Sequence, residues 1–279
     1  MAQSRSWHGP VGRVLAVVAV ALLVVVFVHP FLTMLFTSFK HPQDVFHAPP
    51  ELLPREWTLD SFRVALDQMP VGRYFLNTLL IAGLTVAGTI FACPLVAYSL
   101  AKVEWRGRTP LLAIVLAVMM LPPQVTMIPV FLLWNNIGAQ GTYWPLITPA
   151  WFGTPFLIFM IRQFLTRVPN ALVEAARIDG ASELRIYRSI VLPLAVPALI
   201  TAGVFQFVWT WTDFLNPLIY LDDDSQYTLS IGLYNFFGEH DVAWGPLMAA
   251  CVLFTLPALV VFVLAQRYFI GGAAVGALK

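Results

Sequence analysis

The chain is dominated by long runs of apolar residues that are separated by shorter polar segments. A helix rises about 1.5 Å per residue, so about 20 apolar residues are needed to cross a bilayer. The fourth run is short and is interrupted by Pro149 and Pro155. The fifth is long enough to include a bent end near Asn216 and Pro217. The pattern predicts an all-α membrane protein with six transmembrane helices, at residues 14–36, 76–101, 111–134, 144–161, 190–220 and 246–266.

Composition supports this interpretation. Of the 279 residues, 59% are hydrophobic and 11% are charged, whereas soluble domains are about a quarter charged. A net charge of +1 gives no basic footprint for nucleic acid. The first run is longer than the apolar core of a signal peptide and precedes no small-residue cleavage site, so we expect it to remain as a helix. Cys93 and Cys251 lie in predicted spans, where packing is expected rather than a disulfide or a metal site.

Basic residues are distributed unevenly between the two sides of the predicted spans. Twelve of the 16 Lys and Arg residues lie in segments 1–13, 102–110, 162–189 and 267–279. Cytoplasmic loops carry such an excess of positive charge. On the other side, the external loop 37–75 has four basic and five acidic residues. The last external loop has five acidic residues and no Lys or Arg. Both termini are therefore expected in the cytoplasm, which requires an even number of spans.

The longest predicted cytoplasmic loop, residues 162–189, favours helices. Pro169 suits a first helical position, and the stretch ALVEAARI that follows it soon after is rich in strong helix formers. Gly180 is suited to end that helix in a left-handed turn. Ser182 can cap a second helix, with Glu183 in its first turn. We expect a helix, a glycine turn and a second helix that leads into the next span.

This loop carries the string EAARIDGASELRIYRSIVLP, which resembles the EAA signature of permease subunits of ATP-binding-cassette (ABC) importers. The resemblance implies the type I ABC importer permease fold, with a permease core at residues 72–268. It also implies that the loop is a coupling element that seats in a cleft of an ATPase subunit. The residues implied for this coupling are Glu174, Ala175, Ala176, Asp179, Gly180, Ile190, Leu192 and Pro193.

Segments 37–62, 120–138, 211–221 and 266–279 resemble the second permease of carbohydrate importers of the maltose type, although Asn216 stands where an aromatic residue is common. The implied partners are a different second permease, two copies of an ATPase subunit, an extracytoplasmic solute-binding protein and the lipid bilayer. The implied location is a bacterial inner membrane. ATP and Mg²⁺ would be held by the ATPase subunits, and this chain would bind no cofactor. The solute would be a disaccharide, an oligosaccharide or a glycerol-phosphate type of compound.

Four residues are candidates for the solute path: Asp213, Trp211, Gln206 and Asn135. An ionisable residue at membrane depth is a functional hypothesis. Amides can hydrogen-bond sugar hydroxyls, and the indoles of Trp211 and Trp209 can stack on a sugar ring. Each residue also has a structural interpretation, because tryptophan is enriched at membrane interfaces and an aspartate can cap a helix. For Asp213, near the outer end of its span, we favour the cap.

Two other classes of protein fit the sequence less well. A secondary transporter needs its own coupling site, such as paired acids or inverted repeats, and Asp213 is the one acid within the predicted spans. A membrane enzyme needs a catalytic constellation. The sequence has no GxxxxGK[ST] phosphate loop and no HExxH motif, and its five histidines are scattered. The sequence therefore favours a transport subunit that is not an enzyme.

Overall fold

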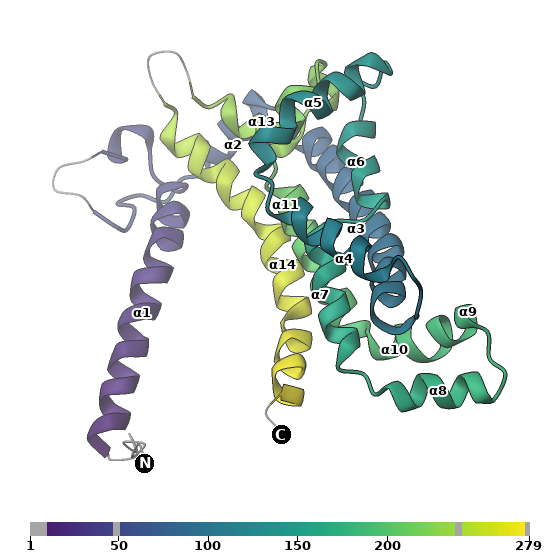
Figure 1. Ribbon diagram of the computed structural model, residues 1–279. Coiled ribbons are helices and arrows are strands. Elements are labelled where there is room, and N and C mark those ends of the chain that lie inside the picture. Colours follow the sequence, from purple (N-terminus) through teal and green to yellow (C-terminus); the bar gives the residue numbers. More distant parts are fainter. Residues whose placement is uncertain (1–9, 47–50, 238–241, 277–279) are drawn as a thin grey trace. The chain divides into compact units, whose positions relative to one another are not determined.

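In the computed structural model, which describes residues 10–46, 51–237 and 242–276, the chain is built from helices (Figure 1). Within these ranges, one isolated antiparallel bridge joins Phe237 and Val242. The chain divides into two compact units. The first comprises Met1–Met69 and Asn235–Thr255, and the second comprises Pro70–Tyr234 and Leu256–Lys279.

The first unit contains α1 (Pro10–Thr37), the short 3-10 helix η1 (Pro42–Asp44) and α2 (Asp60–Gln68). Apolar side chains of α1 are exposed along most of the helix, as expected of a span that contacts lipid. The loop that follows packs around Phe39, whose ring centroid lies 5.5 Å from that of Trp57 and 5.1 Å from that of Phe62. The hydroxyl of Thr58 accepts a hydrogen bond from the amide of Asp60 (3.1 Å) and so caps the start of α2.

The second unit is organised around α3 (Val71–Lys102), whose 32 residues span about 48 Å. This helix packs against α6 (Trp144–Trp151), α7 (Pro155–Thr166) and α11 (Val196–Trp211). Gly88 permits the close contact with α6, because a Cβ atom there would lie 2.6 Å from the Trp151 side chain. The main apolar core of this unit surrounds the second half of α3 and includes Cys93, Ala97, Leu100, Leu157, Ile161 and Ala202.

Two predicted spans are bent. The segment predicted at 111–134 consists of α4 (Arg108–Met119) and α5 (Pro123–Asn136), which meet at 102°. The break coincides with Pro122 and Pro123, which lack the amide protons that would continue the helix. The segment predicted at 190–220 begins inside the π-helical turn η2 (Tyr187–Val191), which follows α9 (Glu183–Ile186), and it continues through α10 (Leu192–Leu194) into α11. The stretch Glu183–Leu194 meets α11 at 76°.

The remaining helices are α8 (Asn170–Ile178), α12 (Leu215–Tyr220), η3 (Asp224–Gln226), α13 (Leu229–Tyr234) and α14 (Trp244–Gly276). The predicted end of the last span at residue 266 is thus followed by more helix, and part of the predicted tail is helical. In the described residues, four helices are long and apolar enough to cross a membrane, or up to six if each bent pair is one span. Cys93 is buried, Cys251 is partly buried, and both are free thiols.

Candidate functional site

The loop after α7 folds as a helical hairpin. The expected helix, glycine turn and second helix are present as α8, Gly180 and α9. Gly180 has a φ of +78°, and the amide of Ala181 donates to the carbonyl of Ala176 (2.9 Å), which closes the end of α8. The hydroxyl of Ser182 accepts from the amide of Arg185 (3.4 Å) and caps α9. Figure 1 shows α8 and α9 at one end of the second unit.

The hairpin is fastened to the end of α3 by charged and hydrogen-bonded side chains. The guanidinium of Arg177 lies 2.7 Å from the Glu183 carboxylate, and it also donates to the Lys102 carbonyl (3.1 Å). The hydrogen bond to Glu183 raises the pKa of Arg177 above its ordinary value. The hydroxyl of Tyr98, on α3, donates to Glu183 (2.6 Å). These contacts join the hairpin directly to the last turns of α3.

Lys102 is the most deeply placed charged group of this contact, with 6% of its surface exposed. Its ammonium group donates to the carbonyl of Val168 and to the side chain of Asn170, both at 2.6 Å. These two residues connect α7 to α8. In the sequence, Lys102 stood out only as one of several basic loop residues. Its position in the last turn of a span was the available signal, because a cation there meets unpaired helix-end carbonyls.

We expect Lys102→Met to loosen the start of the hairpin. The change keeps the apolar stem and removes two charge-assisted hydrogen bonds, each of about 1.5–3 kcal/mol. Hydrogen exchange of the amides in residues 168–173 should accelerate about tenfold or more, as measured by mass spectrometry. Arg106→Met, at an exposed position in the neighbouring loop, is the control and should leave these amides unchanged. Equal exchange in wild type and Lys102→Met would contradict the anchoring role.

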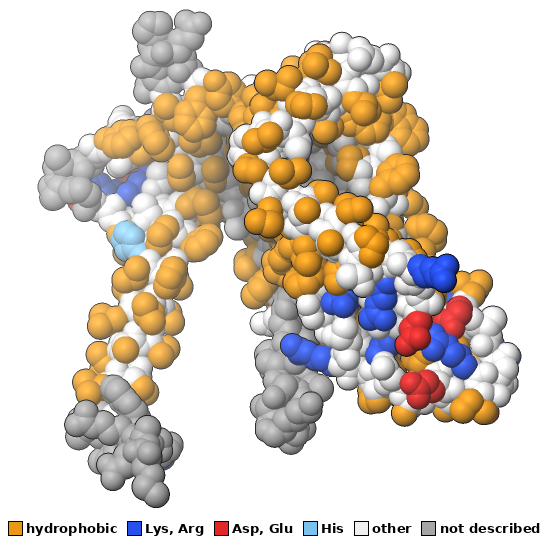
Figure 2. All heavy atoms as spheres, viewed as in Figure 1, with side chains coloured by type: hydrophobic (Ala, Val, Ile, Leu, Met, Phe, Trp, Pro, Cys, Tyr) orange, Lys and Arg blue, Asp and Glu red, His pale blue; other side chains and the backbone are white. Residues whose placement is uncertain are grey.

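The residues implied for coupling fall into two groups. Glu174, Ala175, Asp179 and Gly180 are exposed on the hairpin, whereas Ala176 packs into the core of the unit. Ile190, Leu192 and Pro193 lie apart from them, where η2 passes into α10. The hairpin also exposes three large apolar side chains, Leu172, Ile178 and Leu184. Figure 2 shows that charged side chains gather at this end of the second unit. The hairpin thus presents a mixed apolar and charged surface.

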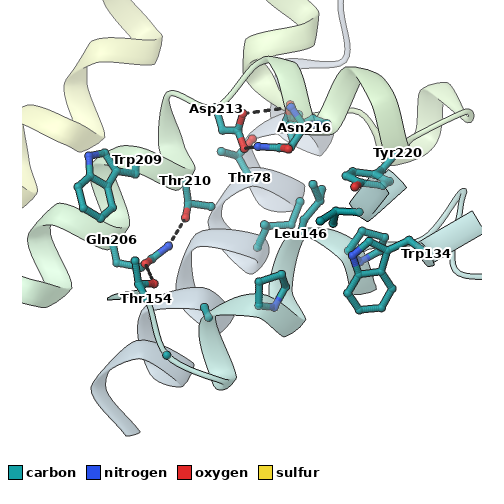
Figure 3. A pocket seen from close by; sticks show the side chains of 18 of the residues that line it. Thr78, Trp134, Leu146, Thr154, Gln206, Trp209, Thr210, Asp213, Asn216 and Tyr220 are labelled. Atoms are coloured by element: carbon teal, nitrogen blue, oxygen red, sulfur yellow. Dashed lines mark hydrogen bonds between the residues drawn. The ribbon is translucent and has the colours of Figure 1, made fainter. Parts of the chain in front are cut away.

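A cavity of about 400 Å³ opens in the second unit between α3, α5, α6, α11 and α12 (Figure 3). Its volume lies within the range of small-molecule sites. Its polar lining consists of Thr78, Thr154, Gln206, Thr210, Asp213, Asn216 and Thr228, and its aromatic lining of Trp134, Trp209 and Tyr220. In the described part of the chain, no group of three His, Cys, Asp or Glu side chains is placed to hold a metal ion.

Gln206 joins three structural elements at one side of this cavity. Its side-chain oxygen accepts from Thr89 on α3 (3.1 Å) and from Thr154, which precedes α7 (3.3 Å). Its amide nitrogen donates to Thr210 (3.1 Å), whose hydroxyl lies 3.0 Å from that of Thr85 on α3. Within a bilayer such polar groups must be satisfied inside the protein. The network therefore fixes the wall of the cavity to α3.

Asp213 occupies the break between α11 and α12. One carboxylate oxygen accepts from the backbone amide of Asn216 (3.2 Å) and the other from its side-chain amide (2.8 Å). These are the contacts of a helix cap, as expected from the sequence. The same side chain also lines the cavity, and Figure 3 shows Asp213 and Asn216 beside each other there.

The structure separates the four candidate path residues. Gln206 and Asp213 line the same cavity. Trp211 has no exposed surface, and its ring centroid lies 5.7 Å from that of Phe75 and 5.3 Å from that of Phe207. Asn135 is exposed on α5 and is not among the lining residues. Trp211 and Asn135 are therefore placed outside the cavity.

Several lining or supporting residues were missed in the sequence, among them Trp134, Tyr220, Thr154 and Thr210. One signal was available on α3. Thr78, Thr85 and Thr89 recur at intervals of seven and four residues in an apolar run, which places them on one face of a helix. All three are buried, and Thr85 and Thr89 bind side chains of α11, namely those of Thr210 and Gln206. The partners on other helices could not be read from this spacing.

Comparison with known proteins identifies the class. Residues 85–272 match the family described as "binding-protein-dependent transport system inner membrane component". The probable ABC transporter permease YurM of Bacillus subtilis is 32% identical over 276 residues, which cover 99% of this chain and 91% of that one. The trehalose/maltose transport permease MalG of Thermococcus litoralis is 30% identical over 273 residues, which cover 96% and 97%.

Among solved structures, a chain of a bacterial ABC transporter that imports the acidic polysaccharide alginate is similar in fold. The TM-score is 0.82 at 22% identity, and the match covers 96% of this chain and 99% of that chain. The fold is that of a type I ABC importer permease. The chain belongs to the family of binding-protein-dependent transport system inner membrane components. Its named relatives are transport components rather than enzymes, and it is a membrane protein.

Proposed function

We propose that this chain is one of two different permease subunits that together form the path by which an ABC importer takes up a sugar. Membership of the family and the trehalose/maltose relative support this function. The observation that carries the proposal is the α8–α9 hairpin, which exposes Glu174 at one end of the second unit and is fastened to α3.

In the proposed mechanism, the hairpin seats in a cleft of an ATPase subunit. Glu174 pairs with a basic group of that subunit, while Leu172 and Ile178 supply apolar contact. Closure of the ATPase dimer on ATP moves the hairpin, and the contacts of Arg177 and Lys102 transmit the movement to α3. The hydroxyl of Thr89 connects α3 to Gln206 at the cavity. The path then alternates between two packed arrangements of the helices.

The proposed arrangement in the membrane has six spans with both termini in the cytoplasm. The basic residues support it, because Lys102, Arg162 and Arg167 belong to the same end of the second unit as the hairpin. The proposed partners are a second permease, two ATPase subunits that hold ATP and Mg²⁺, and an external solute-binding protein. This chain is proposed to bind no cofactor.

The lining of the cavity supports an uncharged saccharide as the solute. Hydroxyl and amide groups can exchange hydrogen bonds with sugar hydroxyls, and Asp213 adds two acceptor oxygens. Within the lining there is no Lys, Arg or His that would pair with a phosphate. A disaccharide or oligosaccharide therefore fits this chain better than a glycerol phosphate.

Glu174→Lys tests the function. The complex of both permeases, the ATPase subunits and the binding protein is reconstituted in vesicles, and ATP-dependent uptake is measured with a panel of labelled disaccharides and oligosaccharides. We expect uptake to fall about tenfold or more and the ATPase subunits to be lost from the purified permease pair. The physical reason is that a charge-assisted contact worth about 1.5–3 kcal/mol becomes a repulsion.

Arg106→Glu is the matched control, because it reverses an exposed charge in the loop after α3 and outside the hairpin. It should keep both uptake and ATPase binding. If Glu174→Lys behaves as this control does, the hairpin is only a connector. Solute uptake by this chain without an ATPase would instead identify a secondary transporter.

A further inference from the structure

Three aromatic side chains form a cluster beside the cavity. Phe156 lies in the first turn of α7, and Phe205 and Trp209 lie one turn apart on α11. The ring centroids of the three pairs lie 6.0, 5.7 and 5.6 Å apart. Each side chain keeps about two fifths of its surface exposed, at 40%, 38% and 41%. A cluster with this exposure presents open ring surface instead of filling the core.

The cluster adjoins two hollows of the second unit. Trp209 lines the cavity between α3, α5, α6, α11 and α12. Phe156 lines a different hollow, a more open groove of about 450 Å³. This groove is formed by α7, the start of α11 and Tyr268 of α14. The groove follows α7 from Phe156 to Arg167, which lies at the end where the hairpin begins. The cluster therefore lies between the cavity and the end of the unit that faces the ATPase in the proposed function.

Hydrogen-bonding groups line both hollows that the cluster adjoins. Gln206 and Thr154 line the cavity together with Trp209. Further along the groove are the polar side chains of Gln163 and Thr201. A sugar ring has an apolar C–H face and a rim of hydroxyl groups, and it is recognised by an aromatic face with hydrogen-bonding groups at its edge. A lipid chain would use the rings but not the amides and hydroxyls.

We propose that Phe156, Phe205 and Trp209 are a stacking surface over which the rings of a saccharide pass from the cavity into the groove. This inference rests on the proposed function and adds residues and a ligand class to its path. Because the three rings adjoin one another, a sugar that leaves one ring face meets the next without losing contact. Passage of the saccharide would require the flat aromatic faces of these side chains, and apolar side chains of similar volume would not replace them.

The test compares Trp209→Phe, which keeps an aromatic face, with Trp209→Leu, which keeps apolar bulk alone. Uptake kinetics are measured on the complete reconstituted complex, with the disaccharide or oligosaccharide that the wild type takes up best. We expect Trp209→Phe to keep transport efficiency within about threefold and Trp209→Leu to lose about tenfold. Phe205→Leu should cause a similar loss. Phe91→Leu, at an exposed aromatic position of α3 outside both hollows, should have no effect.

Other outcomes would overturn the inference. Equal transport by Trp209→Leu and Trp209→Phe would mean that the cluster contacts lipid or neighbouring helices through bulk alone. Loss of the second permease from purified Trp209→Leu would mean that the cluster is a subunit interface. In both cases saccharide uptake by the wild type leaves the proposed function standing. If the wild-type complex takes up no saccharide, the proposed function fails, and this inference fails with it.

Discussion

Gly180→Val is expected to reduce ATP-dependent uptake about tenfold or more and to weaken binding of the ATPase subunits. Gly180 turns the chain between α8 and α9 with a φ of +78°. A side chain in this left-handed region costs about 1–2 kcal/mol, and a β-branched side chain is the least tolerated there. Apart from the two chain neighbours of Gly180, no heavy atom of the described residues lies within 4 Å of a Cβ built at this position, so the effect comes from backbone strain and not from a clash. The hairpin would lose the shape that presents Glu174.

Two comparisons separate this effect from general destabilisation. Gly180→Asn should keep most of the uptake, because asparagine adopts left-handed conformations more readily than other side chains. Gly138→Val is a matched control, since Gly138 has a φ of +71° and open space around its Cβ position but lies outside the hairpin. It should retain ATPase binding. Uptake and ATPase pull-down are measured on the same samples, and equal behaviour of the valine and asparagine variants of Gly180 would refute the coupling role of the turn.

Trp211→Ala is expected to destabilise the second unit strongly. Its side chain is fully buried, and its ring packs against Phe75 on α3 and Phe207 on α11. Removing a buried tryptophan side chain costs about 3–5 kcal/mol. Thermal unfolding of the detergent-solubilised complex, followed by size-exclusion chromatography, should show a clear fall in the transition temperature. Trp211→Phe keeps most of the ring contact and should restore most of the difference.

Trp209→Ala, two residues earlier on the same helix, is expected to impair uptake without destabilising the second unit. Because Trp209 is 41% exposed, its removal should change the transition temperature little while uptake falls. A stable Trp211→Ala complex with impaired uptake would reverse these assignments and return Trp211 to the solute path. The pair therefore tests directly which tryptophan supports the fold and which contacts the solute.

The hairpin could be predicted from the sequence because its signals are local. Gly180 and Ser182 act on the adjacent backbone, so each position follows from the neighbouring residues. The existence of apolar spans was predictable for a similar reason, since the length and hydropathy of a segment are read along the chain itself. The resemblance to the EAA signature is borne out at the level of the family, whereas the coupling roles of its residues remain predictions.

The cavity could not be predicted in the same way, because its walls come from helices far apart in the sequence. Asp213 and Gln206 were recognised as polar residues within a span, but the partners of Gln206, Thr89 and Thr154, lie on other elements. The bend at Pro122 and Pro123 also required the structure, since prolines are accommodated in many membrane helices. The two prolines favour a break in the helix, but the angle between the two helices depends on how they pack.

Trp209 and Trp211 illustrate the difference between what the sequence predicts and what the packing of helices decides. The amino-acid sequence alone predicted that both indoles lie within the fifth apolar run, because hydropathy is a property of the segment. Two residues apart, they point about 200° away from each other around a helix. Which direction is buried depends on the helices that pack there. Tertiary structure placed Trp211 against Phe75 and left Trp209 at the cavity, because only packing between helices distinguishes the two faces.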